Sequence, residues 1–359
     1  MEAKQTVSAA QFFGMMLVAR STLTLSLSAR WAAGEGLPQA LLSYLLAMAL
    51  GFGLALPVWG LHRRYPTLPV GEAARRLLGR AGAGVALLYL LYLVVMGGVS
   101  LALFQLFLQQ AFHPDFPAWL IVAAMAGAAA FGACRGLEAV ARCAGCVLVL
   151  LALGTALVFG AAALRFQPEN LTPLFPARPL ALLKGAALFL GRTTLFADMA
   201  VLLPFVKGRK GLGFAAWAGG SSLLVGCLLA LLAGCLGPYA YTQQFPVYAL
   251  ASLTGVRSLQ RLDPVFVALW MTGQIVKAAC DLFACRVCLS SLGAARGPWG
   301  VLGAGAAMLA LGMGAAVWQP LQALLLDPRL WLALTALAGV GAPLALLLAA
   351  RLRGEGRRG

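Results

Sequence analysis

The chain has 359 residues, of which 62% are hydrophobic and 11% charged, and its mean hydropathy is +0.89. Soluble domains carry about 25% charged residues, so this composition excludes a sizeable water-soluble domain. The formal net charge is +16, but loops rich in basic residues alternate with loops poor in them. That alternation is typical of a membrane protein and argues against a nucleic-acid partner.

Ten apolar stretches fill the chain, and each can cross a bilayer, which takes about 20 residues. With the N-terminus in the cytoplasm, the inner connections hold 17 of the 27 Lys and Arg residues and the outer ones hold six. This asymmetry predicts that both termini are cytoplasmic. The first stretch is long and carries Arg20, so it is read as a span and not as a cleaved signal peptide. The expected spans are 8–29, 38–60, 83–111, 118–134, 140–164, 180–205, 212–236, 263–285, 299–318 and 330–350.

Three connections between these spans have distinctive sequences. Val70–Arg80 places basic and apolar residues at helical spacing, which predicts a short amphipathic helix on the cytoplasmic surface. The proline-rich outer connection 165–179 is expected to be extended. The outer connection 237–261 is too apolar for a solvated loop, so we expect a re-entrant or interfacial helix over the outer mouth.

The sequence offers little chemistry for catalysis or metal binding. All eight cysteines lie in or beside the expected spans, and the Cys143–Cys146 pair is interpreted as small apolar packing residues. His62 and His113 each lack a second histidine or carboxylate at ligand spacing. No nucleophile–base pair is evident in the spans. We therefore expect no enzyme, no metal and no cofactor.

Six charged residues lie inside the expected spans, which is the most informative feature of the chain. A charge near the centre of a bilayer costs roughly 2.5–3.5 kcal/mol even on lenient insertion scales, so such residues should face a polar protein interior. Lys277 and Asp281 are one helical turn apart and are expected to pair, in either a structural or a functional role. The six residues are Arg20, Lys184, Arg192, Asp198, Lys277 and Asp281. Four are cations and two are anions, so their net charge is +2.

Spans one and six, five spans apart, both interrupt their apolar run with hydroxyl residues beside an arginine. This spacing is expected of two inverted five-helix repeats, in which the first helix of each repeat is broken at mid-membrane beside the ligand site. The alternative is that the hydroxyls hydrogen-bond within their own unbroken helices. The polar residues of span one are Arg20, Ser21, Thr22, Thr24, Ser26 and Ser28, and span six has Gly185, Gly191, Arg192, Thr193, Thr194 and Asp198.

Short motifs occur in a consistent order across nearly the whole chain. They are Tyr65-Pro66-Thr67-Leu68, Leu78-Gly79-Arg80-Ala81-Gly82, Gly136-Leu137-Glu138 with Arg142, Leu171-Thr172-Pro173-Leu174, Leu203-Pro204-Phe205-Val206-Lys207, Phe245-Pro246-Val247-Tyr248, and Arg261-Leu262-Asp263 with Phe266, Trp270, Lys277 and Leu292. Together these motifs resemble the spore germination permeases, the B-type subunits of nutrient germinant receptors within the amino acid–polyamine–organocation transporter superfamily. The chain departs from the family where span one reads Ala19-Arg20-Ser21-Thr22-Leu23-Thr24 in place of glycines, and Asp198 matches the usual span-six carboxylate only approximately.

The resemblance implies an all-α integral membrane protein with about ten transmembrane helices in a 5+5 inverted-repeat fold, helices one and six being interrupted. Residues 1–359 would form one transmembrane domain, with repeat one at about 8–164, repeat two at about 180–318, and 330–350 completing the last helix pair. It further implies a germinant receptor subunit of the spore inner membrane, with A-type and C-type subunits as partners. The alternative is a secondary transporter of amino acids or related solutes.

The expected ligand is a small amino acid or similar carboxylate, held between spans one, three, six and eight. Arg20 and Arg192 are the candidate carboxylate partners, because arginine grips a carboxylate in bidentate fashion; the alternative is that both are structural posts tied to carbonyl oxygens. A fixed cation there would also replace the sodium ion that some transporters of this fold bind. The candidate ligand-binding residues are Arg20, Ser21, Thr22, Thr24, Tyr92, Met96, Gly191, Arg192, Thr193, Thr194, Phe196, Asp198, Trp270, Gln274, Lys277 and Asp281.

Overall fold

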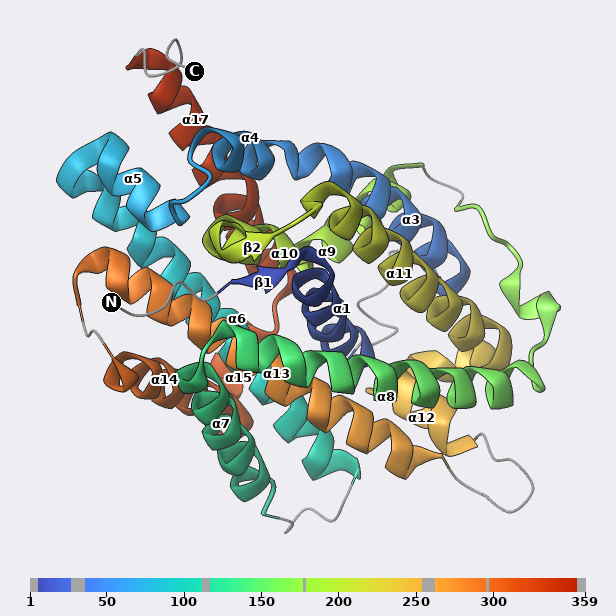
Figure 1. Ribbon diagram of the computed structural model, residues 1–359. Helices are drawn as coiled ribbons and strands as arrows, with labels where there is room; N and C mark the ends of the chain where they lie inside the picture. The colour runs from blue at the N-terminus through green and yellow to red at the C-terminus, as the bar shows by residue number, and fades with distance from the viewer. Residues whose placement is uncertain are drawn as a thin grey trace.

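The computed structural model describes residues 6–26, 36–111, 117–176, 179–253, 262–294 and 297–353. This part of the chain forms a bundle of packed helices (Figure 1). Two short strands, β1 (Val7–Ser8) and β2 (Val206–Lys207), pair in parallel with Val7 opposite Val206. They join the start of the chain to the segment that follows α10 (Leu195–Leu202).

The remaining helices differ widely in length, from seven residues to thirty. They are α1 (Ala9–Leu25), α3 (Leu37–Leu54), α4 (Leu56–Arg64), α5 (Val70–Leu78), α6 (Ala83–Ala111), α7 (Ala118–Arg135), α8 (Leu137–Ala163), α9 (Pro179–Gly191), α11 (Lys210–Leu231), α12 (Pro246–Leu253), α13 (Asp263–Leu292), α14 (Pro298–Val317), α15 (Gln319–Leu325), α16 (Pro328–Ala336) and α17 (Ala342–Leu352). Short 3-10 helices lie at Gly79–Gly82, Pro168–Leu171, Leu203–Phe205 and Gly237–Thr242, and π-helical turns lie at Leu232–Leu236 and Leu337–Gly341.

Within the described residues, eight helical segments are long and apolar enough to cross a membrane. They correspond to eight of the ten expected spans. The other two expected spans form α1, which has 17 residues, and α13, which has 30 and carries Lys277 and Asp281. Both helices lie inside the bundle, where α13 packs against α1, α6, α7, α8 and α14. A helix shielded from lipid by its neighbours can carry polar groups, which explains why these two are less apolar than the rest.

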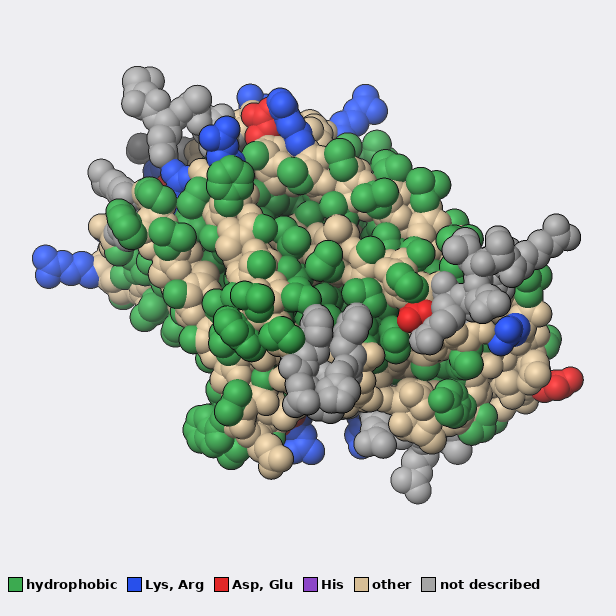
Figure 2. Space-filling view, turned by 90° about the horizontal axis from the view of Figure 1, so that it is seen from below, with side chains coloured by type: hydrophobic (Ala, Val, Ile, Leu, Met, Phe, Trp, Pro, Cys, Tyr) green, Lys and Arg blue, Asp and Glu red, His purple; other side chains and the backbone are tan. Residues whose placement is uncertain are grey.

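The outer surface of the bundle has the composition of a lipid-facing belt. In Figure 2, hydrophobic side chains are spread over the whole visible face between backbone and other side chains, and Lys, Arg, Asp and Glu lie mainly near its edges. Phe131, Leu153 and Leu223 are each more than 60% exposed on three different helices. Exposed apolar area on this scale requires a non-aqueous surrounding, which agrees with a multi-pass membrane protein.

The connections follow the sequence predictions in part. Val70–Leu78 forms the expected amphipathic helix α5, and α12 is the expected helix of the second outer connection. The first outer connection contains a 3-10 turn at Pro168–Leu171, so the expectation of a fully extended segment is wrong. Some of the charged residues in the expected connections lie outside the described residues: Lys4, Arg30, Asp115, Arg178, Arg257, Arg261, Arg296, Arg357 and Arg358.

Lys184 corrects the expected set of buried charges. It lies on α9 and is exposed, whereas the next residue, Gly185, is buried against Ser43 of α3. A lysine near a helix end can extend its ammonium toward the membrane interface, so it needs no buried partner. The buried charged residues of the described chain are therefore Arg20, Arg192, Asp198, Lys277 and Asp281, with a net charge of +1.

Candidate functional site

The sixth span is broken at mid-length, as its sequence predicts. α9 ends at Gly191 and α10 begins at Leu195, which leaves Arg192, Thr193 and Thr194 between two half-helices. Gly191 permits this geometry, since an added Cβ would lie 2.9 Å from the backbone of Leu332 on α16. α10 has no side-chain cap at its N-terminus, so the break exposes backbone N–H groups inside the protein.

Arg20 of α1 reaches across to this break. Its Nη1 donates to the carbonyl oxygen of Arg192 at 2.9 Å and to Oγ1 of Thr193 at 3.2 Å. Its guanidinium also lies 5.6 Å from the ring centroid of Tyr44, within cation–π range. Arg20 thus donates to a carbonyl oxygen that the end of α9 leaves without a partner in its own helix. This contact is the one expected if Arg20 has a structural role.

Side chains of two further helices, α16 and α6, lie on the other side of the break. The Arg192 guanidinium lies 5.0 Å from the ring centroid of Trp331, and Oγ1 of Thr335 donates to the carbonyl oxygen of Gly191 at 2.8 Å. The hydroxyl of Tyr92 on α6 then contacts Thr335 Oγ1 at 3.2 Å. Polar groups from α6 and α16 therefore converge on the carbonyl end of α9.

The first span is not broken where the sequence suggested. α1 runs without interruption from Ala9 to Leu25, through Arg20 and the hydroxyl residues. Ser21 donates to Val18 O at 2.6 Å, and Thr22 donates to Ala19 O at 2.8 Å. Thr24 and Ser26 bond to their own helix in the same way. No break lies at Arg20, Ser21, Thr22 or Thr24, because these hydroxyls are satisfied within α1; the residues that follow Ser26 in the expected first span lie outside the described residues. Ser28, the last of the expected polar positions, lies outside the described residues.

A second charged cluster lies on α13. Lys277 Nζ and Asp281 Oδ2 are 2.5 Å apart, and both side chains are almost fully buried. Asp198 of α10 lies within electrostatic range of both groups. Oδ1 of Asp198 is buried and makes no hydrogen bond within the described residues. The expected Lys277–Asp281 pair is thus present. Of the two cations that the sequence offers as partners for Asp198, Arg192 and Lys184, the second is exposed on α9 and is not a buried partner.

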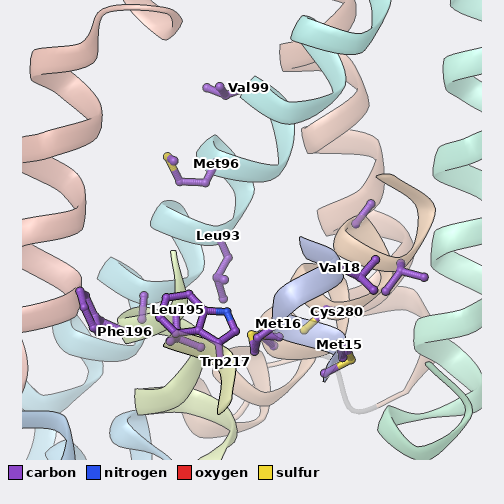
Figure 3. Close-up of a cluster of buried hydrophobic side chains, with 14 of the residues drawn as sticks. Met15, Met16, Val18, Leu93, Met96, Val99, Leu195, Phe196, Trp217 and Cys280 are labelled. Carbon is purple, nitrogen blue, oxygen red and sulfur yellow. The ribbon is translucent and has the colours of Figure 1, made fainter. Parts of the chain in front are cut away.

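The remaining predicted residues divide between two places. In Figure 3, Phe196 lies beside Leu195 and near Trp217, whereas Met96 lies farther along α6. Gln274 pairs with Ser100, its Nε2 lying 2.7 Å from the serine hydroxyl. Trp270 belongs to an aromatic cluster with Phe104, Phe107, Phe245 and Phe266, so its ring packs away from the break.

The break borders a small cavity whose walls include two hydrogen-bond donors without acceptors. The cavity has about 10 Å³ of room for the centre of a water molecule, enough for roughly one water. Arg20 and Trp217 both line it, and Arg20 Nε and Trp217 Nε1 are buried without a hydrogen-bond partner among the described residues. Two unsatisfied donors beside a half-helix N-terminus favour an acceptor or an anion. The lining residues are Met16, Arg20, Leu23, Arg192, Thr193, Thr194, Leu195 and Trp217.

Sequence reasoning missed four residues of this site. Tyr44, Trp217, Trp331 and Thr335 lie in spans that carry no charge in their interior, so they were not singled out. A polar or aromatic-polar side chain within an otherwise apolar span was the available signal. Which of them meet the break depends on helix packing, which the sequence does not show.

Residues 6–295 match the sequence profile of the family described as "Spore germination protein" (Spore_permease). The chain belongs to this family. Among solved structures, the chain is similar to one titled "Substrate-bound outward-open state of a Na+-coupled sialic acid symporter reveals a novel Na+-site". The TM-score is 0.65 and the identity 12%, over 93% of this chain and 79% of that one. No curated protein sequence matches the chain.

These comparisons support the transporter-like fold of a multi-pass membrane protein in the spore germination family. At 12% identity the structural likeness concerns the fold alone. Within the described residues, no cluster of three or more His, Cys, Asp or Glu could hold a metal ion. Ligand binding by the candidate residues stays a prediction.

Proposed function

We propose that this protein is the membrane subunit of a spore nutrient germinant receptor, which binds a small amino-acid-like germinant at the break between α9 and α10 and thereby triggers germination. Membership of the spore germination family supports the receptor role. The observation that carries the binding site is the pair of unsatisfied donors, Arg20 Nε and Trp217 Nε1, beside the break.

A carboxylate suits these donors. It accepts hydrogen bonds from a guanidinium and an indole together, and it interacts favourably with the N-terminus of α10. Thr193 and Thr194 line the same cavity, and the Thr193 hydroxyl donates to the carbonyl oxygen of Phe189 at 3.0 Å. The cavity has room for about one water, so ligand binding requires the surrounding helices to separate. A receptor that changes conformation when it binds its ligand needs this property.

The wider assembly follows from the same proposal. α1 and α13 complete ten spans, arranged as two inverted repeats of five in one transmembrane domain. The protein lies in the spore inner membrane with both termini in the cytoplasm. Its partners are an A-type membrane subunit and a C-type lipoprotein, which receive the conformational signal.

The binding site is tested by comparing an amino acid with its amide on the purified full-length protein. We expect the amide to bind at least about ten-fold more weakly, because a charged hydrogen bond contributes roughly 1.5–3 kcal/mol. Trp217→Phe removes the indole N–H donor and should weaken binding of the amino acid by a similar factor. Trp299→Phe, at an exposed tryptophan, is the matched control.

Arg192→Gln removes the charge at the break and keeps much of the volume, with Arg329→Gln at an exposed arginine as its control. The carboxylate hypothesis is wrong if the wild type binds acid and amide equally and neither Trp217→Phe nor Arg192→Gln changes the affinity. Arg20 and Arg192 would then be structural posts.

The alternative, a secondary transporter, is separated by a flux measurement. Proteoliposomes containing the protein are loaded with unlabelled amino acid and exposed to radiolabelled amino acid outside. A receptor binds the label with saturation but accumulates no more than one molecule per protein. Uptake of many molecules per protein would favour the transporter.

A further inference from the structure

A second and much larger hollow lies at the end of the bundle that carries β1 and β2. It is a groove of about 520 Å³ between the first turns of α1, the first turns of α11 and the middle of α8. It opens on the surface of the protein. The groove is lined by Ser8, Ala9, Ala10, Phe13, Gly14, Leu17, Leu148, Lys207, Gly208, Arg209, Leu212, Gly213, Ala216 and Trp217.

The walls of the groove are apolar because small residues keep α1 and α11 close without filling the space between them. A Cβ added to Gly213 would lie 2.4 Å from the Phe13 ring, so the two helices touch at this point. Ala10 and Ala216 are exposed alanines on the two facing helices. From Ser8 to Leu17 the groove follows α1 for nine residues, or about 13 Å. This shape suits an extended hydrocarbon chain.

The mouth of the groove is basic. Lys207 and Arg209 are exposed, and they are the charged residues among the fourteen lining positions in the described part of the chain, none of which is acidic. Gly208 between them has φ +94° with open space around it. α11 begins at Lys210 with no side-chain cap, so its first N–H groups and its dipole also favour a negative charge here.

We propose that this groove binds an anionic phospholipid, with an acyl chain along α1 and α11 and the phosphate at Lys207 and Arg209. The basic mouth lies on the predicted cytoplasmic side, where the positive-inside asymmetry places it beside anionic headgroups. The apolar part continues into the lipid-facing surface of α11, where Leu212 is 65% exposed. A site with a charged mouth and an apolar floor fits the two halves of one lipid molecule.

The chemistry favours a lipid over a protein helix as the occupant. A helix docked here would place backbone and side chains against Lys207 and Arg209, and it would need acidic residues at that one position. A phospholipid supplies the phosphate and the chain in one molecule at high local concentration. The groove and the proposed germinant cavity are separate hollows that share Trp217 as a lining residue, so the groove residues chosen for substitution below line the groove alone.

The test measures lipid retention by native mass spectrometry of the full-length protein with dioleoylphosphatidylglycerol or dioleoylphosphatidylcholine. The wild type should retain phosphatidylglycerol in preference to phosphatidylcholine. Each basic residue near a membrane surface contributes about five-fold, so the double variant Lys207→Gln/Arg209→Gln should lose about thirty-fold. Arg351→Gln/Arg353→Gln removes the same charge from exposed residues of α17 and its C-terminal cap and should keep the preference.

The apolar floor has its own matched pair of variants. Ala216→Phe fills the groove and should lower phosphatidylglycerol retention by about ten-fold, whereas Ala215→Phe, at the adjacent exposed position outside the groove, should not. If Ala216→Phe and Ala215→Phe had equal effects, the basic residues would merely attract headgroups to the surface. That result would overturn the proposal that the groove binds the acyl chain. The proposal would also be overturned if the wild type showed no preference for phosphatidylglycerol. The same holds if Arg351→Gln/Arg353→Gln lost as much retention of this lipid as Lys207→Gln/Arg209→Gln. A photoreactive residue at position 10 that captures a protein instead of lipid in intact membranes would assign the groove to a partner.

Discussion

Breaking the buried pair on α13 gives a direct test of how the charges inside the bundle are balanced. The three variants are Lys277→Met, Asp281→Leu and the double substitution. Each single substitution removes one partner of an ion pair whose side chains are 1% and 4% exposed. Removing one member of a buried pair costs about 3–5 kcal/mol, because the other charge is left without compensation.

The structure predicts that the two single variants are unequal. Asp198 lies near both groups, so Lys277→Met leaves two buried carboxylates facing each other without a cation. Asp281→Leu instead leaves Lys277 with Asp198, a carboxylate that already interacts with it in the wild type. We therefore expect Lys277→Met to reach the upper end of the 3–5 kcal/mol range and Asp281→Leu to fall below it. The double variant leaves Asp198 alone and should be milder than Lys277→Met.

The assay is the thermal midpoint of the detergent-solubilised protein, followed by size-exclusion fluorescence, together with the yield from membranes. The order from most to least stable should be wild type, Asp281→Leu, the double variant and Lys277→Met. Simple additivity of the two single effects would refute the coupling, since contacting charges are expected to be non-additive. A stable double variant that no longer responds to ligand would give the pair a functional role. A double variant with the stability of the wild type and an unchanged response to ligand would show that the pair has only a structural role.

Two further predictions concern packing and topology. Gly191→Ala should destabilise the protein by about 1–3 kcal/mol, because the new methyl group meets the Leu332 backbone at 2.9 Å; Gly53→Ala, with no atom within 4 Å of its Cβ, should be neutral or slightly stabilising in the same thermal assay. For topology, a cysteine at Gln243 should react with an impermeant thiol reagent in sealed right-side-out vesicles and one at Gly208 should not, so labelling at Gly208 would show that the orientation is reversed.

The spans and the break in the sixth helix were predictable because they depend on local composition. Long apolar runs define a membrane span by length alone. At the break, Gly191 is followed by an arginine and two threonines, which interrupt the apolar run over several consecutive residues. The ion pair was predictable for a similar reason, since four residues separate Lys277 from Asp281 on one helix.

Whether the first helix is broken at its hydroxyl residues was not predictable from its sequence. A serine or threonine inside a membrane can bond to its own helix or line a break, and both outcomes have the same residue pattern. In α1 the hydroxyl of Ser21 meets Val18 O, so the helix continues. The partners of Arg20 were also hidden, because Tyr44 and Thr193 come from other spans and meet it only through packing.

The contact between α1 and the break determines how a ligand would act at the site. A carboxylate at the N-terminus of α10 would compete with the Arg192 carbonyl oxygen for the guanidinium of Arg20. Weakening that contact frees α10, all eight of whose residues are buried. α10 leads through Leu203–Phe205 to β2, which pairs with β1 directly before α1. A ligand that shifts α10 would therefore pull on the β1–β2 pair at the predicted cytoplasmic face, and this short covalent path gives the proposed receptor a route from its binding site to its partners.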